Sequence, residues 1–150
     1  MKLTWTNAPK VTPKDKIGFV YGILDLKNGK KYFGIKKLWR TIKKAPTKYK
    51  MKDGKWLKDK KGKRIINTRK TKEHIRVETD WRDYNGSGNF LDLIKKNPER
   101  FQKTIIKFCD SVTEMKLEEA WLQLSHWKND EWDKLYNEEI NLRLRVRKKG

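Results

Sequence analysis

Three groups of residues in this chain of 150 residues have types and spacing that could support chemistry. Tyr21 and Tyr32 lie in two short apolar runs, Arg40 lies in a basic stretch, and Glu118 and Glu119 are adjacent acids further along. A tyrosine hydroxyl can accept a proton, a guanidinium can hold two phosphate oxygens, and a carboxylate can bind a divalent metal. Together these groups are what metal-assisted hydrolysis of a phosphodiester requires.

A predicted β-hairpin would position the two tyrosines. Residues 17–26 (IGFVYGILDL) form a nearly continuous apolar run, which is typical of a buried strand. The Asn-Gly dipeptide at 28–29 is a strong hairpin signal, because both central residues of such a turn need a positive φ. Residues 31–35 (KYFGI) then form the returning strand, so Tyr21 and Tyr32 are expected on paired strands.

The following segments predict helices and a third strand. Residues 36–44 (KKLWRTIKK) have apolar residues at helical spacing and predict a short basic helix that carries Arg40. Residues 89–96 predict another helix, and residues 101–109 (FQKTIIKFC) predict the third strand. The Ser-Val-Thr-Glu sequence at 111–114 matches a capping box, so a long helix is expected to about residue 127.

The long helix is interpreted as core-facing, with Leu117, Trp121, Leu124 and Lys128 along one stripe. Cys109 is interpreted as a buried apolar residue, and Trp81 and Tyr84 as packing residues rather than base-stacking ones.

The order of these elements indicates one α/β or α+β domain over residues 17–150. Residues 1–16 contain two prolines and no periodicity, and are expected to form a loose leader. Residues of about 45–76 are Lys-rich and are interpreted as an inserted arm, in which 55–57 and 64–66 could form a small hairpin. The alternating sequence at 140–146 predicts a last strand or an extended segment.

The net charge of +20 is concentrated in one part of the chain. Residues 27–76 contain 21 Lys and Arg but only the acids Asp53, Asp59 and Glu73, whereas acids outnumber lysines over residues 114–139. Such a basic excess favours a polyanionic partner, with nucleic acid ahead of a membrane surface.

Composition also excludes several protein classes. No stretch approaches the roughly 18 apolar residues of a membrane span, and residues 1–16 lack the apolar core of a secretory signal. The single cysteine cannot form an internal disulfide, and with two histidines it is too little for a zinc cluster. A reducing cytoplasm is the expected compartment.

Two tripeptides carry a resemblance to a known superfamily. Phe19-Val20-Tyr21 and, ten residues later, Tyr32-Phe33-Gly34 resemble the paired motif of the GIY-YIG nucleases. The continuation YFGIKKLWR, a basic insertion, DWRDYNGSG, a strand, LEEA and INLR resembles the bacteriophage endonucleases of the Seg-type homing group, over roughly residues 17–146. The resemblance implies a small three-stranded antiparallel sheet flanked by helices.

The chain departs from the family pattern at three positions. Phe19 replaces the first glycine, and Phe33 replaces the usual isoleucine; both keep an apolar strand residue. Lys44 stands where several members have a histidine, which puts a second general base there in doubt.

The resemblance also implies roles for particular residues. One tyrosine would be the general base toward the attacking water, and the other would support it, with a nearby lysine supplying positive charge. The helix arginine would hold the scissile phosphate, one carboxylate would bind Mg²⁺ or Mn²⁺, and a late asparagine would pack beside the site. In this order the matching residues are Tyr21, Tyr32, Lys36, Arg40, Glu119 (or its neighbour Glu118) and Asn141.

These observations predict a divalent-metal-dependent DNA endonuclease that acts on double-stranded DNA without a small-molecule cofactor, in the bacterial host cytoplasm if the chain is phage-encoded. The expected contacts to the DNA backbone are Lys37, Lys43, Lys44, Lys48, Lys50, Lys55, Lys63, Arg64, Arg69 and Lys70. A catalytically inactive, basic nucleic-acid-binding protein on the same scaffold is the alternative. A ribosomal type of RNA-binding protein would explain the charge but not the ordered motifs.

Overall fold

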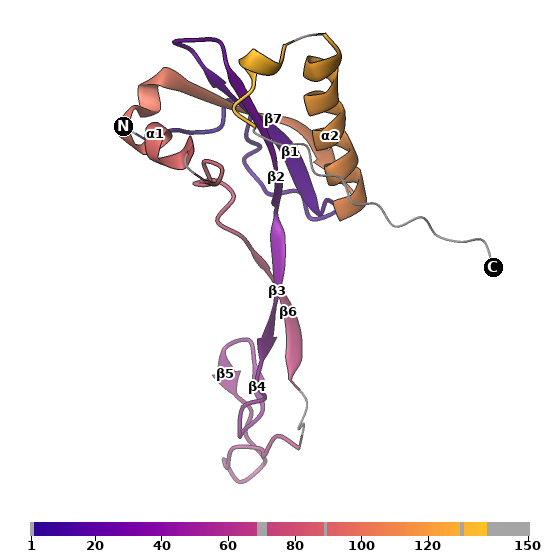
Figure 1. Cartoon of the computed structure of the whole chain (residues 1–150). Coiled ribbons are helices and arrows are strands. Elements are labelled where there is room, and N and C mark those ends of the chain that lie inside the picture. The colour runs from indigo at the N-terminus through magenta and orange to yellow at the C-terminus, as the bar shows by residue number, and fades with distance from the viewer. Residues whose placement is uncertain (1, 69–71, 89, 130, 138–150) are drawn as a thin grey trace, which may run out of the picture. The chain divides into compact units, whose positions relative to one another are not determined.

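The computed structural model describes residues 2–68, 72–88, 90–129 and 131–137 (Figure 1). Contacts divide the chain into two compact units. The first, which we call the sheet unit, comprises Met1–Trp39 and Glu78–Gly150, and the second, the arm unit, comprises Arg40–Val77. The expected C-terminal strand at 140–146 lies outside the described residues.

The sheet unit contains a three-stranded antiparallel sheet in the order β2-β1-β7. Its strands are β1 (Gly18–Asp25), β2 (Lys31–Lys37) and β7 (Phe101–Cys109). β1 and β2 form the expected hairpin, with Gly29 at a φ of 73° in the connecting turn. The predicted α+β class and the predicted three-stranded antiparallel sheet are therefore confirmed.

Alternation along the central strand β1 gives the sheet two different faces. Phe19, Tyr21 and Ile23 are buried in one core cluster, which also contains residues of α1 (Phe90–Lys96). Val20 belongs to a second cluster, with Met115 of α2 (Val112–Lys128). α1 and α2 consequently lie on opposite sides of the sheet (Figure 1). Two 3-10 turns, η1 (Pro98–Arg100) and η2 (Trp132–Lys134), complete the unit.

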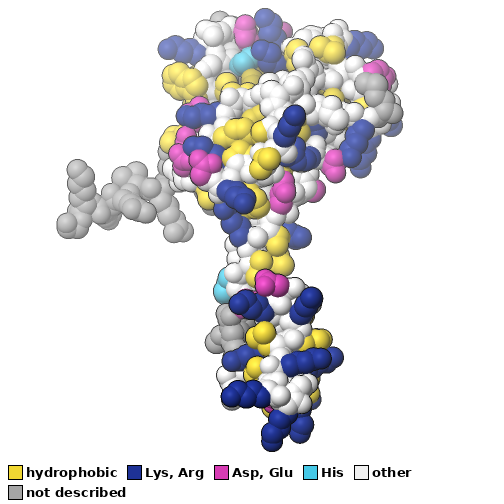
Figure 2. Space-filling view, turned by 180° about the vertical axis from the view of Figure 1, so that it is seen from behind, with side chains coloured by type: hydrophobic (Ala, Val, Ile, Leu, Met, Phe, Trp, Pro, Cys, Tyr) yellow, Lys and Arg dark blue, Asp and Glu magenta, His cyan; other side chains and the backbone are white. Residues whose placement is uncertain are grey.

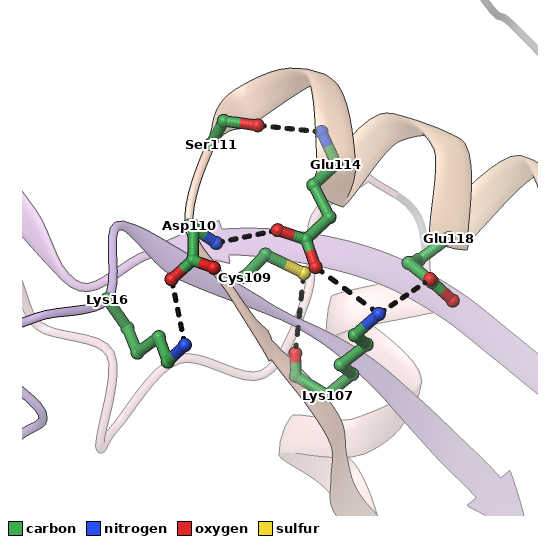
Figure 3. A network of polar contacts seen from close by, with 7 residues as sticks. All are labelled: Lys16, Lys107, Cys109, Asp110, Ser111, Glu114 and Glu118. Carbon is green, nitrogen blue, oxygen red and sulfur yellow. Dashed lines mark hydrogen bonds and ion pairs between the residues drawn. The ribbon is translucent and has the colours of Figure 1, made fainter.

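The start of α2 has the predicted cap by Ser111, and Glu114 reaches back one residue beyond it, to Asp110 (Figure 3). The Glu114 amide donates to Ser111 Oγ at 3.1 Å, and the Asp110 amide donates to the Glu114 carboxylate at 2.8 Å. Lys107 of β7 then pairs with Glu114 at 3.2 Å and with Glu118 at 2.9 Å. These contacts fix the first two turns of the helix against the strand that precedes it.

The apolar stripe of α2 faces outward, contrary to the interpretation made from the sequence. Leu117, Trp121 and Leu124 have exposed fractions of 45%, 69% and 40%. The buried residues of the helix are Met115, Ala120 and Gln123. The Met115 side chain packs against β1 at Gly18. A Cβ atom at Gly18 would lie 2.3 Å from the Met115 sulfur, so only glycine leaves room for it. A small residue on the strand and Ala120 on the helix allow this face, rather than the bulkier stripe, to approach the sheet.

Residues 3–7, which we expected to be part of a loose leader, lie along β7, with Leu3 and Trp5 in the core and Thr4, Thr6 and Asn7 exposed. Asn7 makes two hydrogen bonds with the Ile105 backbone, at 2.7 and 2.9 Å. Trp5 also forms a parallel bridge with Lys103. The physical reason is that β7 is an edge strand, whose free backbone groups this segment satisfies.

The arm unit consists of short strands. β3 (Trp39–Lys44) pairs with β6 (Glu73–Glu78), and β4 (Met51–Lys52) pairs with β5 (Lys55–Trp56). The turn between β4 and β5 uses positive φ angles, 52° at Asp53 and 74° at Gly54. The expected pairing of 55–57 with 64–66 is limited to a bridge from Lys58 to Arg64 and a hydrogen bond from Ile65 to Leu57.

The expected basic helix at 36–44 is therefore wrong, because those residues belong to β2 and β3. From Arg40 to Lys44 every residue is exposed, so the helical spacing of the apolar residues is not used to bury a helix face against the core. Pairing with β6, about thirty residues later, satisfies the backbone instead. None of the helices in the described ranges has the length and apolar character needed to cross a bilayer.

Candidate active site

Tyr21 lies at the centre of a group of aromatic side chains in the sheet unit. Its side chain is buried on β1, and its ring centroid lies 6.3 Å from that of Tyr32 on β2, with 36° between the planes. The Tyr84 ring meets Tyr21 edge-on at 5.9 Å. Tyr32 in turn stacks on Phe90 of α1 at 5.1 Å. The two tyrosines of the predicted motifs are thus neighbours, and a third tyrosine joins them.

Gly34 makes room for the Tyr21 hydroxyl, and Gly86 lies beside it. Gly34, the glycine of the second motif, lies directly opposite Tyr21 in the β1–β2 register. A Cβ atom at Gly34 would come within 2.3 Å of the Tyr21 hydroxyl oxygen, and one at Gly86 would lie 3.6 Å from it. Gly86 also has a φ of 90°, which other residues rarely adopt. The hydroxyl therefore lies between β2 and the loop at 85–88.

The environment of Tyr21 keeps its hydroxyl protonated. Burial is the main cause that raises the pKa of Tyr21 far above its usual value, and the neighbouring Tyr84, Tyr32 and Glu119 raise it further. A hydrogen bond with Tyr84 contributes in the same direction. At neutral pH this side chain is a neutral hydrogen-bonding group and not a phenolate.

Lys36 contacts the group of aromatic side chains around Tyr21 by way of the Tyr84 ring. Its ammonium nitrogen lies 2.8 Å from Asp80 Oδ1 and 4.2 Å from the centroid of the Tyr84 ring. Lys36, the cation that we expected near Tyr21 and Tyr32, thus contacts Tyr84, whose ring in turn contacts that of Tyr21. Tyr84 packs against the core cluster, as we inferred from the sequence, and its ring also contacts Lys36.

Sequence reasoning missed the positions of Asp80, Tyr84 and Gly86. All three fall in the stretch DWRDYNGSG, which carried part of the resemblance to the GIY-YIG nucleases. The stretch was therefore recognised as a motif, although no residue in it was assigned a role in the reaction, and Trp81 and Tyr84 were interpreted as packing residues.

The two adjacent glutamates of α2 have different surroundings. Glu118 is held by Lys107 in the ion pair at 2.9 Å (Figure 3). Glu119 is half-buried and accepts a hydrogen bond from Gln123 at 3.4 Å. Burial raises the pKa of Glu119, and the hydrogen bond from Gln123 lowers it only in part. Glu119 belongs to α2, which packs against the face of the sheet opposite to the Tyr21 cluster, and its charge is the smallest of the causes that raise the pKa of Tyr21.

A carboxylate such as that of Glu119 would suit a hard divalent cation that takes few protein ligands. Within the described ranges, no three Asp, Glu, His or Cys residues form a group that could hold a metal ion. The family motif, and not a cluster of ligands, is what assigns Glu119 as a single carboxylate ligand. Mg²⁺ commonly binds proteins in this way, because it keeps several waters and takes one or two carboxylates with phosphate oxygens. A partly desolvated carboxylate also gains from a cation that neutralises it.

The arm unit carries most of the cations expected to contact DNA. Arg40 is exposed on β3, and Figure 2 shows Lys and Arg side chains over this unit. The Arg64 guanidinium lies 4.8 Å from the Trp56 ring, and Tyr49 meets Trp56 edge-on at 6.1 Å. The predicted DNA contacts that are described are all exposed: Lys37 of β2, and Lys43, Lys44, Lys48, Lys50, Lys55, Lys63 and Arg64 of the arm unit. Asn141, Arg69 and Lys70 lie outside the described residues.

Comparison with known proteins agrees with the motif arrangement. The family model described as "Putative endonuclease segE, GIY-YIG domain" matches residues 4–140. No curated protein and no solved structure matches the chain. The match includes the β1–β2 hairpin with Tyr21 and Tyr32, the arm unit and α2 with Glu119, which is nearly the whole length. The chain therefore belongs to the SegE GIY-YIG domain family.

Proposed function

We propose that this chain is a divalent-metal-dependent endonuclease that hydrolyses phosphodiester bonds of double-stranded DNA, of the phage homing-endonuclease type. The observation that carries the proposal is the adjacency of Tyr21 and Tyr32 on paired strands, with the Tyr21 hydroxyl seated against Gly34. In a member of a GIY-YIG family, these are the residues that the motifs assign to the reaction.

The tyrosines orient the attacking water in this proposal. Because burial keeps the Tyr21 hydroxyl protonated, it holds water by hydrogen bonding and not as a free anion. The Tyr84 ring, edge-on to that of Tyr21, borders this hydroxyl, and Lys36, which is paired with Asp80, lies over the Tyr84 ring. The Tyr32 ring lies beside that of Tyr21. Preorganised polar groups of this kind stabilise charge that develops in the transition state.

Glu119 is the proposed ligand of Mg²⁺ or Mn²⁺, which would supply Lewis-acid stabilisation of the phosphodiester and its leaving oxygen. Glu118 is less suited to that role, because Lys107 already neutralises it. Asn141 is proposed to pack beside the site. These assignments follow the family motifs and are supported by the different surroundings of the two glutamates.

Arg40 and the cations of the arm unit are proposed to bind DNA. A guanidinium can hold two oxygens of one phosphate, so Arg40 is assigned to the scissile phosphate. The exposed lysines of the arm unit would bind neighbouring phosphates and release counterions, which gives affinity that falls steeply with salt. The protein would meet DNA in the cytoplasm, that of the bacterial host if the chain is phage-encoded.

A nicking and cleavage assay on supercoiled plasmid tests this function. We expect nicked or linear DNA with Mg²⁺ or Mn²⁺ and none with EDTA. The same samples should be analysed by gel shift, so that binding and cutting are separated. DNA that is bound but stays intact over a range of sequences would favour the alternative, an inactive nucleic-acid-binding protein on this scaffold.

A further inference from the structure

Lys103 is a lysine at a core position of the sheet unit. It lies in β7 between Phe101 and Ile105, which are also buried, and its own exposed fraction is 0%. Lysine is almost never fully buried unless its charge is paired. A buried ammonium group without polar partners would also be costly. This side chain must therefore be held by specific contacts.

The ammonium group of Lys103 has a complete set of partners. It donates to the Tyr84 carbonyl at 2.9 Å, to the side-chain oxygen of Asn85 at 2.9 Å and to the Arg82 carbonyl at 3.3 Å. It also lies 4.4 Å from the Trp5 ring, in cation–π geometry. An ammonium group has three donors, so the three oxygens saturate it.

The three acceptors belong to one segment and are uncharged. Burial lowers the pKa of Lys103 to about 8; Asp83 opposes this decrease and Lys2 adds to it. Asp83 is itself paired with Lys2 at 2.5 Å. Lys103 is thus mostly protonated at neutral pH, and the dipoles of residues 82–85 are its main compensation.

The same segment, residues 82–86, also lies beside Tyr21 of the candidate active site. The Tyr84 ring lies 5.9 Å from that of Tyr21, and a Cβ atom at Gly86 would lie 3.6 Å from the Tyr21 hydroxyl. Lys103 binds the carbonyl of Tyr84 itself, and so it fixes the backbone from which this ring projects. Lys103 consequently acts on Tyr21 through Tyr84.

We propose that Lys103 is a positioning residue, whose buried ammonium group holds residues 82–86 against the Tyr21 hydroxyl. In its effect on cleavage the proposal rests on the proposed nuclease function. The hold on the segment itself is measurable in the free protein, without DNA or metal.

Hydrogen exchange of the full-length protein tests the hold directly. The amides of Asp83 and Tyr84 donate within this segment, to the carbonyls of Asp80 and Trp81. In Lys103→Met these two amides should exchange about tenfold faster, as expected when a hydrogen bond to a charged group is lost. The matched control is Lys107→Met, a lysine of the same strand that is exposed and contacts α2 instead. It should leave the exchange of both amides unchanged.

If Lys103→Met does not fold, the variant Asn85→Ala provides a second hydrogen-exchange test of the same proposal. It removes one acceptor from a loop and leaves the core lysine in place. The same two amides should again exchange faster, while the amides of β1 keep their protection. Unchanged exchange in Asn85→Ala, or faster exchange that is equal across β1, would overturn the proposal.

The cleavage assay separates this proposal from the proposed function. If the wild-type protein cuts DNA, Asn85→Ala should lower the cleavage rate about tenfold at saturating DNA while leaving the Kd for DNA unchanged. An equal loss of binding and rate would indicate a general structural role and would overturn the positioning role. If the wild-type protein does not cut, the proposed function fails, and hydrogen exchange alone decides whether Lys103 holds the segment.

Discussion

Tyr21 on β1 lies directly opposite Gly34 on β2, where a Cβ atom would come within 2.3 Å of the Tyr21 hydroxyl oxygen. The space that the Tyr21 hydroxyl needs thus explains why the second motif has a glycine at this position. Gly34 leaves the space into which the tyrosine of the first motif extends across the neighbouring strand. The two motifs are one structural unit, and a change in either affects the other.

Gly34→Ala should therefore displace the Tyr21 side chain. We expect the free energy of unfolding to fall by about 1–3 kcal/mol, as for overpacking in a core, and DNA cleavage to be lost. Urea denaturation and the plasmid assay measure the two effects. Gly22→Ala, on the neighbouring strand β1, is the control, because a Cβ atom there would come no closer than 3.3 Å to the side chains of Ile106 and Phe33. Equal effects of both substitutions would contradict the role of Gly34.

Glu119→Gln should abolish metal-dependent cleavage while DNA binding is kept. We expect a loss of about two to three orders of magnitude in rate, since a neutral amide cannot replace the charge of the carboxylate. The neighbouring change Glu118→Gln removes only the exposed pair with Lys107 and should leave cleavage near the wild-type rate. The reverse result would assign the ligand to Glu118.

Arg40→Ala should lower the cleavage rate at saturating DNA by about a hundredfold or more, as for the loss of a group that stabilises the transition state. Binding should change little, because many other cations remain on the arm unit. Arg64→Ala, a second exposed arginine of that unit, is the control. It should weaken binding slightly and keep the saturated rate. A full rate in Arg40→Ala would contradict the assignment of the scissile phosphate.

Neutralising Lys43 and Lys44 together should reduce the salt dependence of DNA binding. The slope of log K against log salt should decrease by about 0.9 for each lysine that contacts a phosphate. The matched control neutralises Lys95 and Lys96, another adjacent, exposed pair at the end of α1. Fluorescence anisotropy at several salt concentrations gives both slopes. Identical slopes for the two double variants would argue against DNA contact by the arm unit.

Asp25 should make the protein sensitive to acid. Burial alone would raise the pKa of this carboxyl group, but hydrogen bonds from Arg100, Tyr136 and the Lys27 amide outweigh it and lower the pKa to about 2. Because the folded pKa lies below the unfolded one, the stabilisation is present above about pH 4 and is lost as pH falls toward 2. Its size is on the order of 2 kcal/mol.

Unfolding monitored by circular dichroism between pH 2 and 7 measures this contribution. Asp25→Asn should destabilise the protein at neutral pH and flatten the decrease in stability between pH 4 and 2. Asp92→Asn, an exposed aspartate of α1, is the control and should leave the profile unchanged. A profile for Asp25→Asn that parallels that of the wild-type protein would rule out Asp25 as the cause.

Local patterns in the sequence were sufficient to predict the sheet. The apolar run at 17–26, the Asn-Gly turn and the Ser111 cap of α2 each depend on neighbouring residues, and each is present. The segment at 36–44 fits helical spacing equally well as a pattern. Its partner β6, however, lies far along the chain, and long-range pairing overrides local propensity.

The surroundings of individual side chains could not be predicted in this way. The face of α2 that meets the sheet was determined by the fit of Met115 beside Gly18, which no periodicity reveals. Side chains of β7 alternate between buried and exposed, and Lys103 occupies one of the buried positions. From the sequence, a lysine would ordinarily be assigned to the surface. Only the position of the 82–85 segment in space explains why a charge is tolerated there.

The pairing of residues 5–7 with β7 also has a consequence for the order of folding. The hydrogen bonds between Asn7 and Ile105 close a separation of 98 residues, whereas the β1–β2 hairpin is local. During synthesis the hairpin can form early, but the apolar residues around Trp5 must wait until β7 has left the ribosome. Such high contact order slows folding and leaves apolar surface uncovered in the meantime. The strong positive charge of the nascent arm, by mutual repulsion between chains, would help to keep these intermediates apart.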